Sequence, residues 1–277
     1  MILVTGATGN VGRHVVAQLV EQGHAVRVLT RRPEQVDLPA TVEVAAGDLT
    51  DPDALAAALK DVQSVFLFAA PGSGPGFVAA AERAGVRHVV LLSSGAVDDA
   101  AAEQANLIAA YHWEIEQALR ASALSWTFLR AYSFAANTLA WAGQTKGGDV
   151  IRGAYAGATA APVHEADLAE VAVLALTTPG HQGRIHELTG PDSLTHAEQA
   201  ALLGRALQRP LSYQELPAEV AREAMSAFVP GPVLDAIFSV WSASVGHPAR
   251  TTGTVETLLG RPARSYLSWA QDHAAAF

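Results

Sequence analysis

The sequence predicts an α/β fold in which a doubly wound parallel sheet is followed by a smaller, mainly helical C-terminal lobe. Short apolar runs rich in branched residues alternate with helix-like stretches over the first half of the chain, which is the pattern of βαβ units. The first run, residues 2–4, leads into a glycine-rich turn and then a helix-like stretch. Beyond Gly190 such runs give way to helices separated by prolines.

Strands are expected where an apolar run ends in turn residues. These are residues 2–4, 25–30, 42–46, 64–68, 88–92 and 125–130, with a later strand at 184–188 returning to the same sheet. Helices are expected at 11–20, 52–59, 100–121, 168–176, 195–207, 217–228, 233–244 and 254–259. Residues 149–157 are turn-rich, so we expect a first lobe over 1–150 and a second over 151–277.

The composition excludes several classes of function. Half of the 277 residues are hydrophobic and the net charge is -9, which indicates a large core and argues against a nucleic-acid surface. There is no cysteine, so disulfides, thiolate metal sites and cysteine nucleophiles are excluded. No apolar run has the length of a membrane span, and the chain starts directly in a strand. We expect a cytoplasmic protein that acts on a small molecule, with a homodimer as one option.

A histidine and two carboxylates, His164, Glu165 and Asp167, precede the apolar stretch at 168–176. One interpretation is a metal site. The other is that Asp167 caps the helix and Glu165 favours its dipole. Because no further ligands follow at metal-binding spacing, we expect a helix start and no metal.

The turn after the first strand contains three glycines at a spacing of three residues. A bound phosphate needs a close backbone with free amides, which glycine permits and a helix N-terminus supplies. The alternative is a turn that merely joins strand to helix. The order of strand, glycine turn and helix favours binding. The predicted cofactor-binding residues of this turn are Gly6, Thr8, Gly9, Asn10, Val11 and Gly12.

The second strand indicates which dinucleotide binds. NAD-binding sites usually have an acidic residue near the end of this strand. Here the strand ends at Thr30 and is followed by Arg31 and Arg32, with no carboxylate. Two guanidinium groups suit the additional 2′-phosphate of NADP, although two solvated arginines are the alternative. The sequence therefore favours NADP(H) over NAD(H).

Other predicted cofactor contacts follow later strands. Ala69 and Ala70 come after the strand at 64–68, and their small side chains leave room for a flat cofactor. Ser93 and Ser94 come after the strand at 88–92. Ligands of doubly wound folds bind outside the carboxyl ends of the strands, so these residues and the glycine turn should share one cleft.

Three segments, residues 112–116, 125–130 and 132–137, carry a resemblance to a known family. Together with the Gly-x-x-Gly-x-x-Gly turn, they resemble the NmrA-like branch of the atypical short-chain dehydrogenase/reductases, which includes NADPH-dependent quinone reductases. The resemblance covers most of the chain. It implies a Rossmann sheet that binds NAD(P). It also implies that Asp48 and Leu49 lie against the adenine.

The same resemblance identifies candidate substrate and catalytic residues. It implies that the aromatic segment after the strand at 125–130 contacts substrate through Tyr132, Phe134 and Asn137, and the cofactor through Tyr132. Short-chain enzymes usually have Tyr-x-x-x-Lys on the helix predicted at 100–121, but Tyr111 is followed by Ile115. The candidate catalytic residues are therefore His112, Tyr111 and Ser93. His112 either donates a proton, orients cofactor or substrate, or packs in the core.

Two classes of function remain open at this point. The first is an NADPH-dependent oxidoreductase that reduces a quinone, enone or ketone by hydride transfer. Quinone reduction is compatible with the missing tyrosine–lysine pair, because the developing hydroquinone anion is comparatively stable and needs less proton donation. The second is a nonenzymatic NAD(P)-binding redox sensor of the NmrA type. An epimerase or lyase on the same fold is a further alternative.

Overall fold

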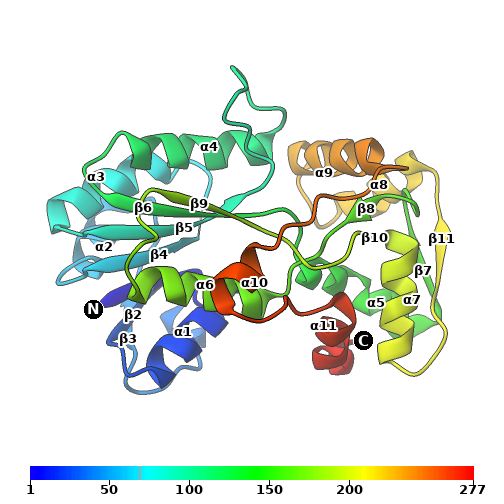
Figure 1. Ribbon diagram of the computed structural model, residues 1–277, viewed down its shortest axis with the longest axis horizontal. Coiled ribbons are helices and arrows are strands. Elements are labelled where there is room, and N and C mark those ends of the chain that lie inside the picture. Colours follow the sequence, from blue (N-terminus) through cyan, green and yellow to red (C-terminus); the bar gives the residue numbers. More distant parts are fainter. Residues whose placement is uncertain (69) are drawn as a thin grey trace. The chain divides into compact units, whose positions relative to one another are not determined.

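The computed structural model describes residues 1–68 and 70–277, and it confirms the α/β class (Figure 1). Seven strands form one sheet in the order β3-β2-β1-β4-β5-β6-β9. Their bounds are β1 Ile2–Thr5, β2 Val26–Thr30, β3 Glu43–Ala46, β4 Ser64–Phe68, β5 His88–Ser94, β6 Ser125–Ala131 and β9 Arg184–Leu188. The strand order reverses between β1 and β4, so the crevice for a ligand is expected at the carboxyl ends of these two strands.

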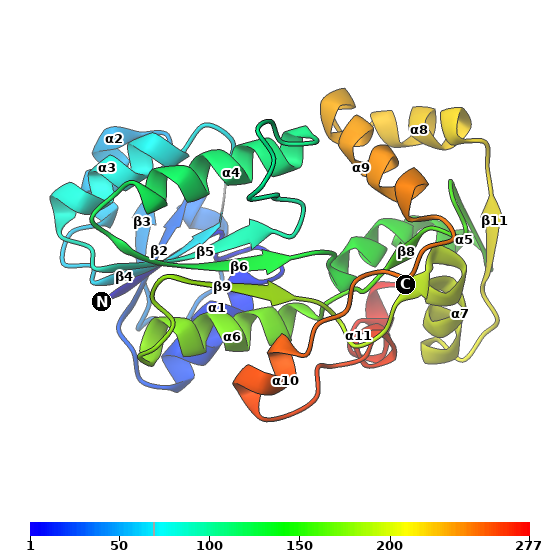
Figure 2. The same ribbon diagram turned by 45° about the horizontal axis from the view of Figure 1, so that its top comes forward.

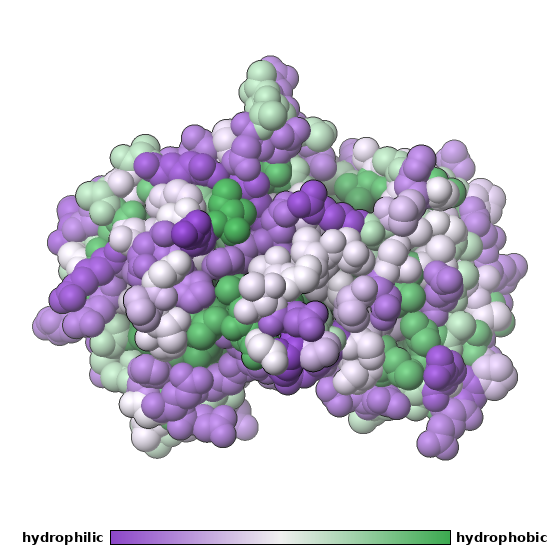
Figure 3. Space-filling view, viewed as in Figure 1, coloured by the Kyte–Doolittle hydropathy of each residue, from purple (hydrophilic) through white to green (hydrophobic). Residues whose placement is uncertain are grey.

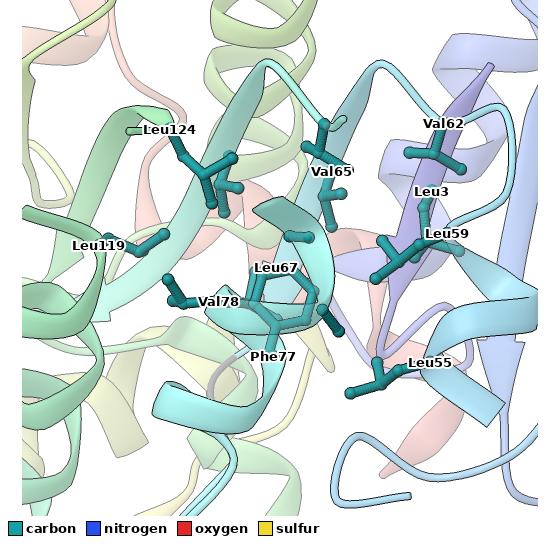
Figure 4. Close-up of a cluster of buried hydrophobic side chains, with 14 of the residues drawn as sticks. Leu3, Leu55, Leu59, Val62, Val65, Leu67, Phe77, Val78, Leu119 and Leu124 are labelled. Atoms are coloured by element: carbon teal, nitrogen blue, oxygen red, sulfur yellow. The ribbon is translucent and has the colours of Figure 1, made fainter. Parts of the chain in front are cut away.

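Helices cover both faces of this sheet (Figure 2). They are α1 Gly12–Glu21, α2 Pro52–Ala58, α3 Gly74–Ala84, α4 Leu107–Arg120 and α6 Glu165–Thr177. On one face, α2, α3 and α4 pack on the strands through a continuous hydrophobic cluster (Figure 4). On the other face α1 packs against α6. Because both faces are buried, the strands have the near-continuous apolar runs that predicted them.

The chain divides into two compact units. Unit 1 contains Met1–Ala105, Ala109–Ala131 and Glu165–Glu187, and unit 2 contains Asn106–Ile108, Tyr132–His164 and Leu188–Phe277. Unit 1 also has the short helix η1, Pro33–Gln35. The elements of unit 2 are η2 Ala135–Trp141, α5 Ala142–Gly147, β7 Val150–Gly153, β8 Thr159–Ala160, β10 Leu194–Thr195, α7 His196–Ala206, β11 Ser212–Glu215, α8 Ala218–Ser226, α9 Gly231–Ser244, α10 Thr254–Leu259, α11 Tyr266–Asp272 and η3 Ala274–Ala276.

Two helix starts differ from the prediction. The helix expected at 100–121 begins only at Leu107. Before it, Asp98 binds the amide of Ala100 at 2.9 Å and exchanges two hydrogen bonds with the Gln104 side chain, which fixes a loop instead of a helical turn. The later helix α6 begins at Glu165, so Asp167 lies inside its first turn and is not the cap.

Unit 2 contains short strands that the sequence analysis does not predict. β7 lies in the segment expected to be a turn-rich crossing, and it pairs in parallel with β11. The paired sequences, VIRG and SYQE, are only four residues long and half polar, so they lack the apolar alternation that identifies a strand. The helix α11 was also not predicted; it buries Tyr266 and Trp269 in the core of this unit.

The surface and the ionisable residues add two observations. Among residues 1–68 and 70–277, no helix is long and apolar enough to cross a membrane. The face seen in Figure 3 is largely hydrophilic, with small separate apolar patches. Within the same part of the chain, no three side chains of His, Cys, Asp or Glu gather in a way that could hold a metal ion.

Candidate functional site

The glycine turn connects β1 to α1 at the point where the strand order reverses. Its conformation is fixed by Gly6, which has a φ of 63° and accepts a hydrogen bond from the amide of Gly9 at 2.9 Å. A Cβ on Gly12 would lie 2.1 Å from the carbonyl oxygen of Gly6, so the turn itself needs glycine there. A Cβ on Gly9 would meet only the Gly6 oxygen, at 3.2 Å. Apart from that one contact, a Cβ on Gly9 would meet no atom within 4 Å, and this room beside the turn fits the phosphate groups of a dinucleotide.

The other residues of the turn divide by exposure. Thr8 and Asn10 are exposed, and Val11 is buried beneath the turn. The turn is held to the next strand by Thr5, whose hydroxyl donates to the carbonyl of Phe66 at 3.3 Å and accepts from the amide of Phe68 at 2.7 Å. This pair of bonds joins β1 and β4 beside the expected crevice.

Phe68 is a candidate site residue that was not predicted from the sequence. It is the last residue of β4, it is 51% exposed, and its Cβ would lie 2.9 Å from a Cβ on Gly6. An exposed aromatic ring beside the phosphate turn is a natural contact surface for a ligand. The sequence feature that could have identified Phe68 is its position as the aromatic residue that ends the apolar run at 64–68. Of the two alanines that follow, Ala69 lies outside the described residues and Ala70 is half-buried.

The ends of β2 and β3 bring Arg31 and Asp48 together. The strands pair with Thr30 opposite Ala46, and Nε of Arg31 lies 3.8 Å from a carboxylate oxygen of Asp48. The pKa of Asp48 is lowered, first because its carboxylate accepts hydrogen bonds from the side chain and amide of Thr50. The Arg31 side chain is 78% exposed, so its remaining donors face solvent.

Two further predicted cofactor contacts, Arg32 and Leu49, lie beside this pair in the sequence. Arg32 is exposed, and its amide donates to the hydroxyl of Thr30 at 3.2 Å. Leu49 is half-buried and packs against the core cluster under α2 and α3. Both arginines therefore lie just beyond the end of β2, where the adenosine part of a dinucleotide is expected in this fold.

Ser93 is part of a buried polar network. It is 2% exposed, and its hydroxyl donates to Oε1 of Glu116 at 2.6 Å. Glu116 on α4 also accepts two hydrogen bonds from Arg130 on β6, at 3.0 Å and 2.6 Å. Arg130 in turn donates to both carboxylate oxygens of Asp99, at 2.7 Å and 2.9 Å. The network joins β5, α4, β6 and the loop before α4.

The charges in this network determine what Ser93 can do. Burial alone would lower the pKa of Arg130, but its hydrogen bonds to Glu116 and Asp99 raise that pKa overall. The pKa of Asp99 is lowered, mainly by the same guanidinium. With the Glu116 carboxylate facing a charged guanidinium, the proton of Ser93 is committed to that carboxylate. Toward a ligand, Ser93 can only accept a hydrogen bond.

Ser94 has a different environment. It is half-buried, and its hydroxyl oxygen accepts a hydrogen bond from the amide of Ala96 at 3.1 Å. This bond uses an oxygen lone pair and leaves the hydroxyl proton to be donated. The two serines at the end of β5 therefore differ in the hydrogen bonds that they can offer a ligand. The hydroxyl of Ser93 can accept one, and the hydroxyl of Ser94 can donate one.

Tyr111 and His112 lie in the first turns of α4. Because β5 ends at the ligand edge of the sheet and α4 returns to the start of β6, these first turns lie nearest that edge. The two rings are in contact, with centroids 4.1 Å apart. His112 is 8% exposed and lies one turn before Glu116 on the buried face. Burial raises the pKa of Tyr111, which keeps its phenol protonated.

The predicted substrate residues belong to unit 2. Tyr132 is 38% exposed, and its amide donates to the carbonyl of Leu188 at 3.3 Å. Phe134 is half-buried just before η2, and Asn137 is exposed within that helix. The structure thus places these three residues in one short segment that follows β6.

Glu116 and Arg130 end two of the segments that carry the family resemblance, but their pairing was not predicted. A usable signal existed in the residues themselves. Glu116 falls on the apolar face of a predicted helix, and Arg130 ends an apolar strand. Buried charges of opposite sign are seldom tolerated unless they pair.

Comparison with known proteins adds independent information. A family model described as NAD(P)H-binding matches residues 6–179, more than half of the chain. The chain is 44% identical to a (4-alkanoyl-5-oxo-2,5-dihydrofuran-3-yl)methyl phosphate reductase of Streptomyces griseus, with 100% of this chain and 99% of the relative covered. It is 34% identical to an NAD(P)H azoreductase of Xenophilus azovorans, with 100% and 99% covered.

A solved structure is also similar over its whole length. The NADPH-dependent quinone oxidoreductase of Escherichia coli, in complex with NADPH, matches with a TM-score of 0.82 and 27% identity, covering 99% of this chain and 100% of that one. The three proteins named here are all reductases, and two act on different acceptors, an azo compound and a quinone. The similarity therefore extends to the type of reaction and leaves the acceptor open.

Proposed function

This chain belongs to the NAD(P)H-binding family of atypical short-chain dehydrogenase/reductases and is an NAD(P)H-dependent reductase, and we propose that its acceptor is an activated carbon–carbon double bond. The proposed substrate class is an unsaturated lactone that carries an acyl group and a phosphate. The name of the Streptomyces griseus relative describes such a molecule, in which the double bond is conjugated to both the lactone and the alkanoyl carbonyl.

One observation carries this proposal: Ile115 occupies the position where short-chain enzymes usually have lysine. Ile115 is 1% exposed, and a Cβ on Gly74 of α3 would lie 2.9 Å from its side chain, so the position is part of the core. Reduction of a simple ketone produces a basic alkoxide that needs a strong proton donor. Hydride addition to a double bond whose α-carbon carries both carbonyl groups takes place at the β-carbon and produces an enolate delocalised over both of them. This enolate is much less basic than an alkoxide, so a weaker proton donor than the tyrosine–lysine pair is sufficient.

The cofactor proposed for this reaction is NADPH, which supplies the hydride when bound. The absence of a side chain at Gly9 suits its diphosphate, and the solvent-facing donors of Arg31 suit its 2′-phosphate. Arg32 extends the same positive surface beyond β2. The absence of an acidic residue directly after this strand removes the usual partner of the NAD ribose.

We assign proton delivery to His112, with Tyr111 as the alternative donor. Both lie in the turns of α4 nearest the ligand edge, and an imidazole transfers protons near neutral pH more readily than a phenol whose pKa is raised by burial. Ser93 is not proposed as a donor because its proton is committed to Glu116. Its proposed role is to accept a hydrogen bond from the cofactor or substrate.

The acceptor class is tested by mixing the NADPH-loaded protein rapidly with four compounds: an acyl butenolide phosphate, a quinone, an azo dye and a saturated ketone. We expect the butenolide to oxidise NADPH at least 100-fold faster than the ketone. Tight NADPH binding without oxidation by any of them would instead favour a redox sensor. Preference for the ketone would contradict the assignment of the double bond.

The donor is tested by comparing His112→Ala with Tyr111→Phe. Loss of a general acid should slow single-turnover reduction by roughly 10²-fold, while NADPH affinity stays within about twofold of the wild type. Tyr111→Phe keeps the ring contact with His112 and should have a smaller effect. A fall in melting temperature with an unchanged rate constant would place His112 in the core only.

A further inference from the structure

The segment between α9 and α10 is held to the rest of unit 2 at two points. Figures 1 and 2 show it as an extended coil. The amide of Ala249 donates to the hydroxyl of Ser193 at 2.7 Å, and the amide of Thr252 donates to the hydroxyl of Thr189 at 2.9 Å. Thr189 is fully buried. Arg250 lies between the two anchors, so its backbone position is fixed.

The guanidinium of Arg250 lies over the ring of Tyr132, 5.8 Å from the ring centroid. Both residues are exposed. Tyr132 directly follows β6, and its amide binds Leu188, the last residue of β9. Arg250 is therefore held beside Tyr132, one of the residues predicted to contact the substrate.

A guanidinium stacked on an aromatic ring is well suited to bind an anion. Stacking engages the flat face of the group and fixes its orientation, and its N–H donors lie in the plane of the group. Two of these donors match two oxygens of a phosphate. The ring also limits the rotamers that a long arginine side chain would otherwise sample before binding.

We propose that Arg250, supported by Tyr132, binds the phosphate monoester of the substrate. This inference rests on the proposed function, since it assumes that the substrate is a phosphorylated lactone. It assigns separate anion-binding positions to the two ligands. Arg31 and Arg32 bind the phosphate of the cofactor, and Arg250 binds that of the substrate.

The turnover experiment compares the lactone phosphate with the same lactone as a free alcohol. For the wild type, we expect kcat/KM to be roughly 10- to 100-fold higher with the phosphate, the value of one charge-assisted hydrogen-bonded contact. Arg250→Ala should lose this preference while its activity on the alcohol and its NADPH affinity are unchanged. Arg250→Lys should keep part of the preference, because it keeps the charge and loses the paired donors.

Two control variants separate the contact from general charge effects. Arg222→Ala removes another arginine of unit 2, one that forms a surface ion pair with Asp235, and it should leave the preference unchanged. Tyr132→Leu removes the aromatic support and should weaken binding of the phosphate less than Arg250→Ala does. Equal weakening of phosphate and alcohol by Arg250→Ala would overturn the proposal.

A binding experiment tests Arg250 independently of turnover. Calorimetric titration with the lactone phosphate should give an affinity that Arg250→Ala lowers by at least tenfold and that added inorganic phosphate weakens competitively. If no lactone is reduced but this difference is found, the proposed function fails and the anion site stands. If the lactone is reduced and Arg250→Ala binds it as tightly as the wild type, the anion site fails and the proposed function stands.

Discussion

Arg130 and Glu116 form a buried ion pair in which Nη2 of the arginine donates to Oε2 of the carboxylate at 2.6 Å. Glu116 is fully buried and Arg130 is 5% exposed. Two charges removed from water are tolerated only while each compensates the other. The pair therefore makes α4 and β6 depend on each other, and it fixes the hydroxyl of Ser93 at the end of β5.

Glu116→Gln keeps the shape of the side chain but leaves Arg130 facing a neutral amide. We expect the free energy of unfolding to fall by about 3–5 kcal/mol, as for other buried pairs that lose one partner. Urea denaturation measures this. Asp99→Asn is the comparison, and since the Asp99 side chain is 48% exposed its loss should be much smaller. Equal losses for both variants would contradict the buried pair as the main contributor.

Gly9→Val should weaken NADPH binding by roughly 100-fold or more while the fold survives. The reason is that a Cβ on Gly9 would meet only the Gly6 oxygen of the protein, at 3.2 Å, but the added side chain would occupy space that the diphosphate needs. Fluorescence titration with NADPH and the melting temperature measure the two effects. Gly12→Ala should instead unfold the protein, because its Cβ would lie 2.1 Å from the Gly6 oxygen. Gly76→Ala, in open space on α3, is the neutral control.

Arg31→Ala should reduce the affinity for NADPH by about 10- to 100-fold and leave NADH binding nearly unchanged. Only NADPH carries the 2′-phosphate, and one charge-assisted hydrogen bond contributes about 1.5–3 kcal/mol. Parallel titrations with both cofactors measure the ratio. Arg32→Ala is the matched variant. A larger effect from Arg32 would identify it as the discriminating residue, and equal weakening of both cofactors would exclude Arg31 from that role.

Acid should destabilise unit 1 through a cluster of histidines. Burial lowers the pKa of His88 and of His186 to about 4 and also lowers that of His181. Nδ1 of His181 lies 3.1 Å from Nε2 of His186, so both atoms cannot carry a proton. His88 binds the Thr127 hydroxyl, which donates to the carbonyl of His181.

The sign of the effect follows from these lowered values. The unfolded chain takes up protons near the ordinary histidine pKa of about 6.5, and the folded protein only near pH 4. The unfolding free energy should therefore be constant above about pH 6.5 and fall as the pH drops toward 4, by at most on the order of 3 kcal/mol for each of the two histidines, since solvent screening reduces the effect at the half-buried His186. Denaturation at several pH values measures this. His186→Gln should remove part of the dependence, since His88 keeps its lowered pKa, and His24→Gln, at an exposed position, should remove none of it.

The sequence predicts the sheet and the glycine turn well because their signals are local. An apolar run followed by glycines shows by itself where the strand ends. In the same way Asp51 caps the nearby helix α2 by accepting hydrogen bonds from the amides of Asp53 and Ala54. The pairing of Glu116 with Arg130 depends on which strand lies beside which helix, so it is not visible in any window of sequence. The start of α4 was missed for a similar reason, since the Asp98–Gln104 bonds compete with helix formation only in the folded loop.

The segmentation of unit 1 has a consequence for how the protein is made. Its last portion, Glu165–Glu187, follows an excursion through Tyr132–His164 into unit 2. That portion provides α6, which packs against α1, and most of the edge strand β9. During synthesis unit 1 cannot complete its fold until residue 187 has left the ribosome. Until then α1 lacks its packing partner α6. A gene fragment ending at Ala131 would therefore lack α6 and β9 and would not encode a complete unit 1. A fragment ending at Glu187, in which a short linker replaces Tyr132–His164, would retain α6 and most of β9.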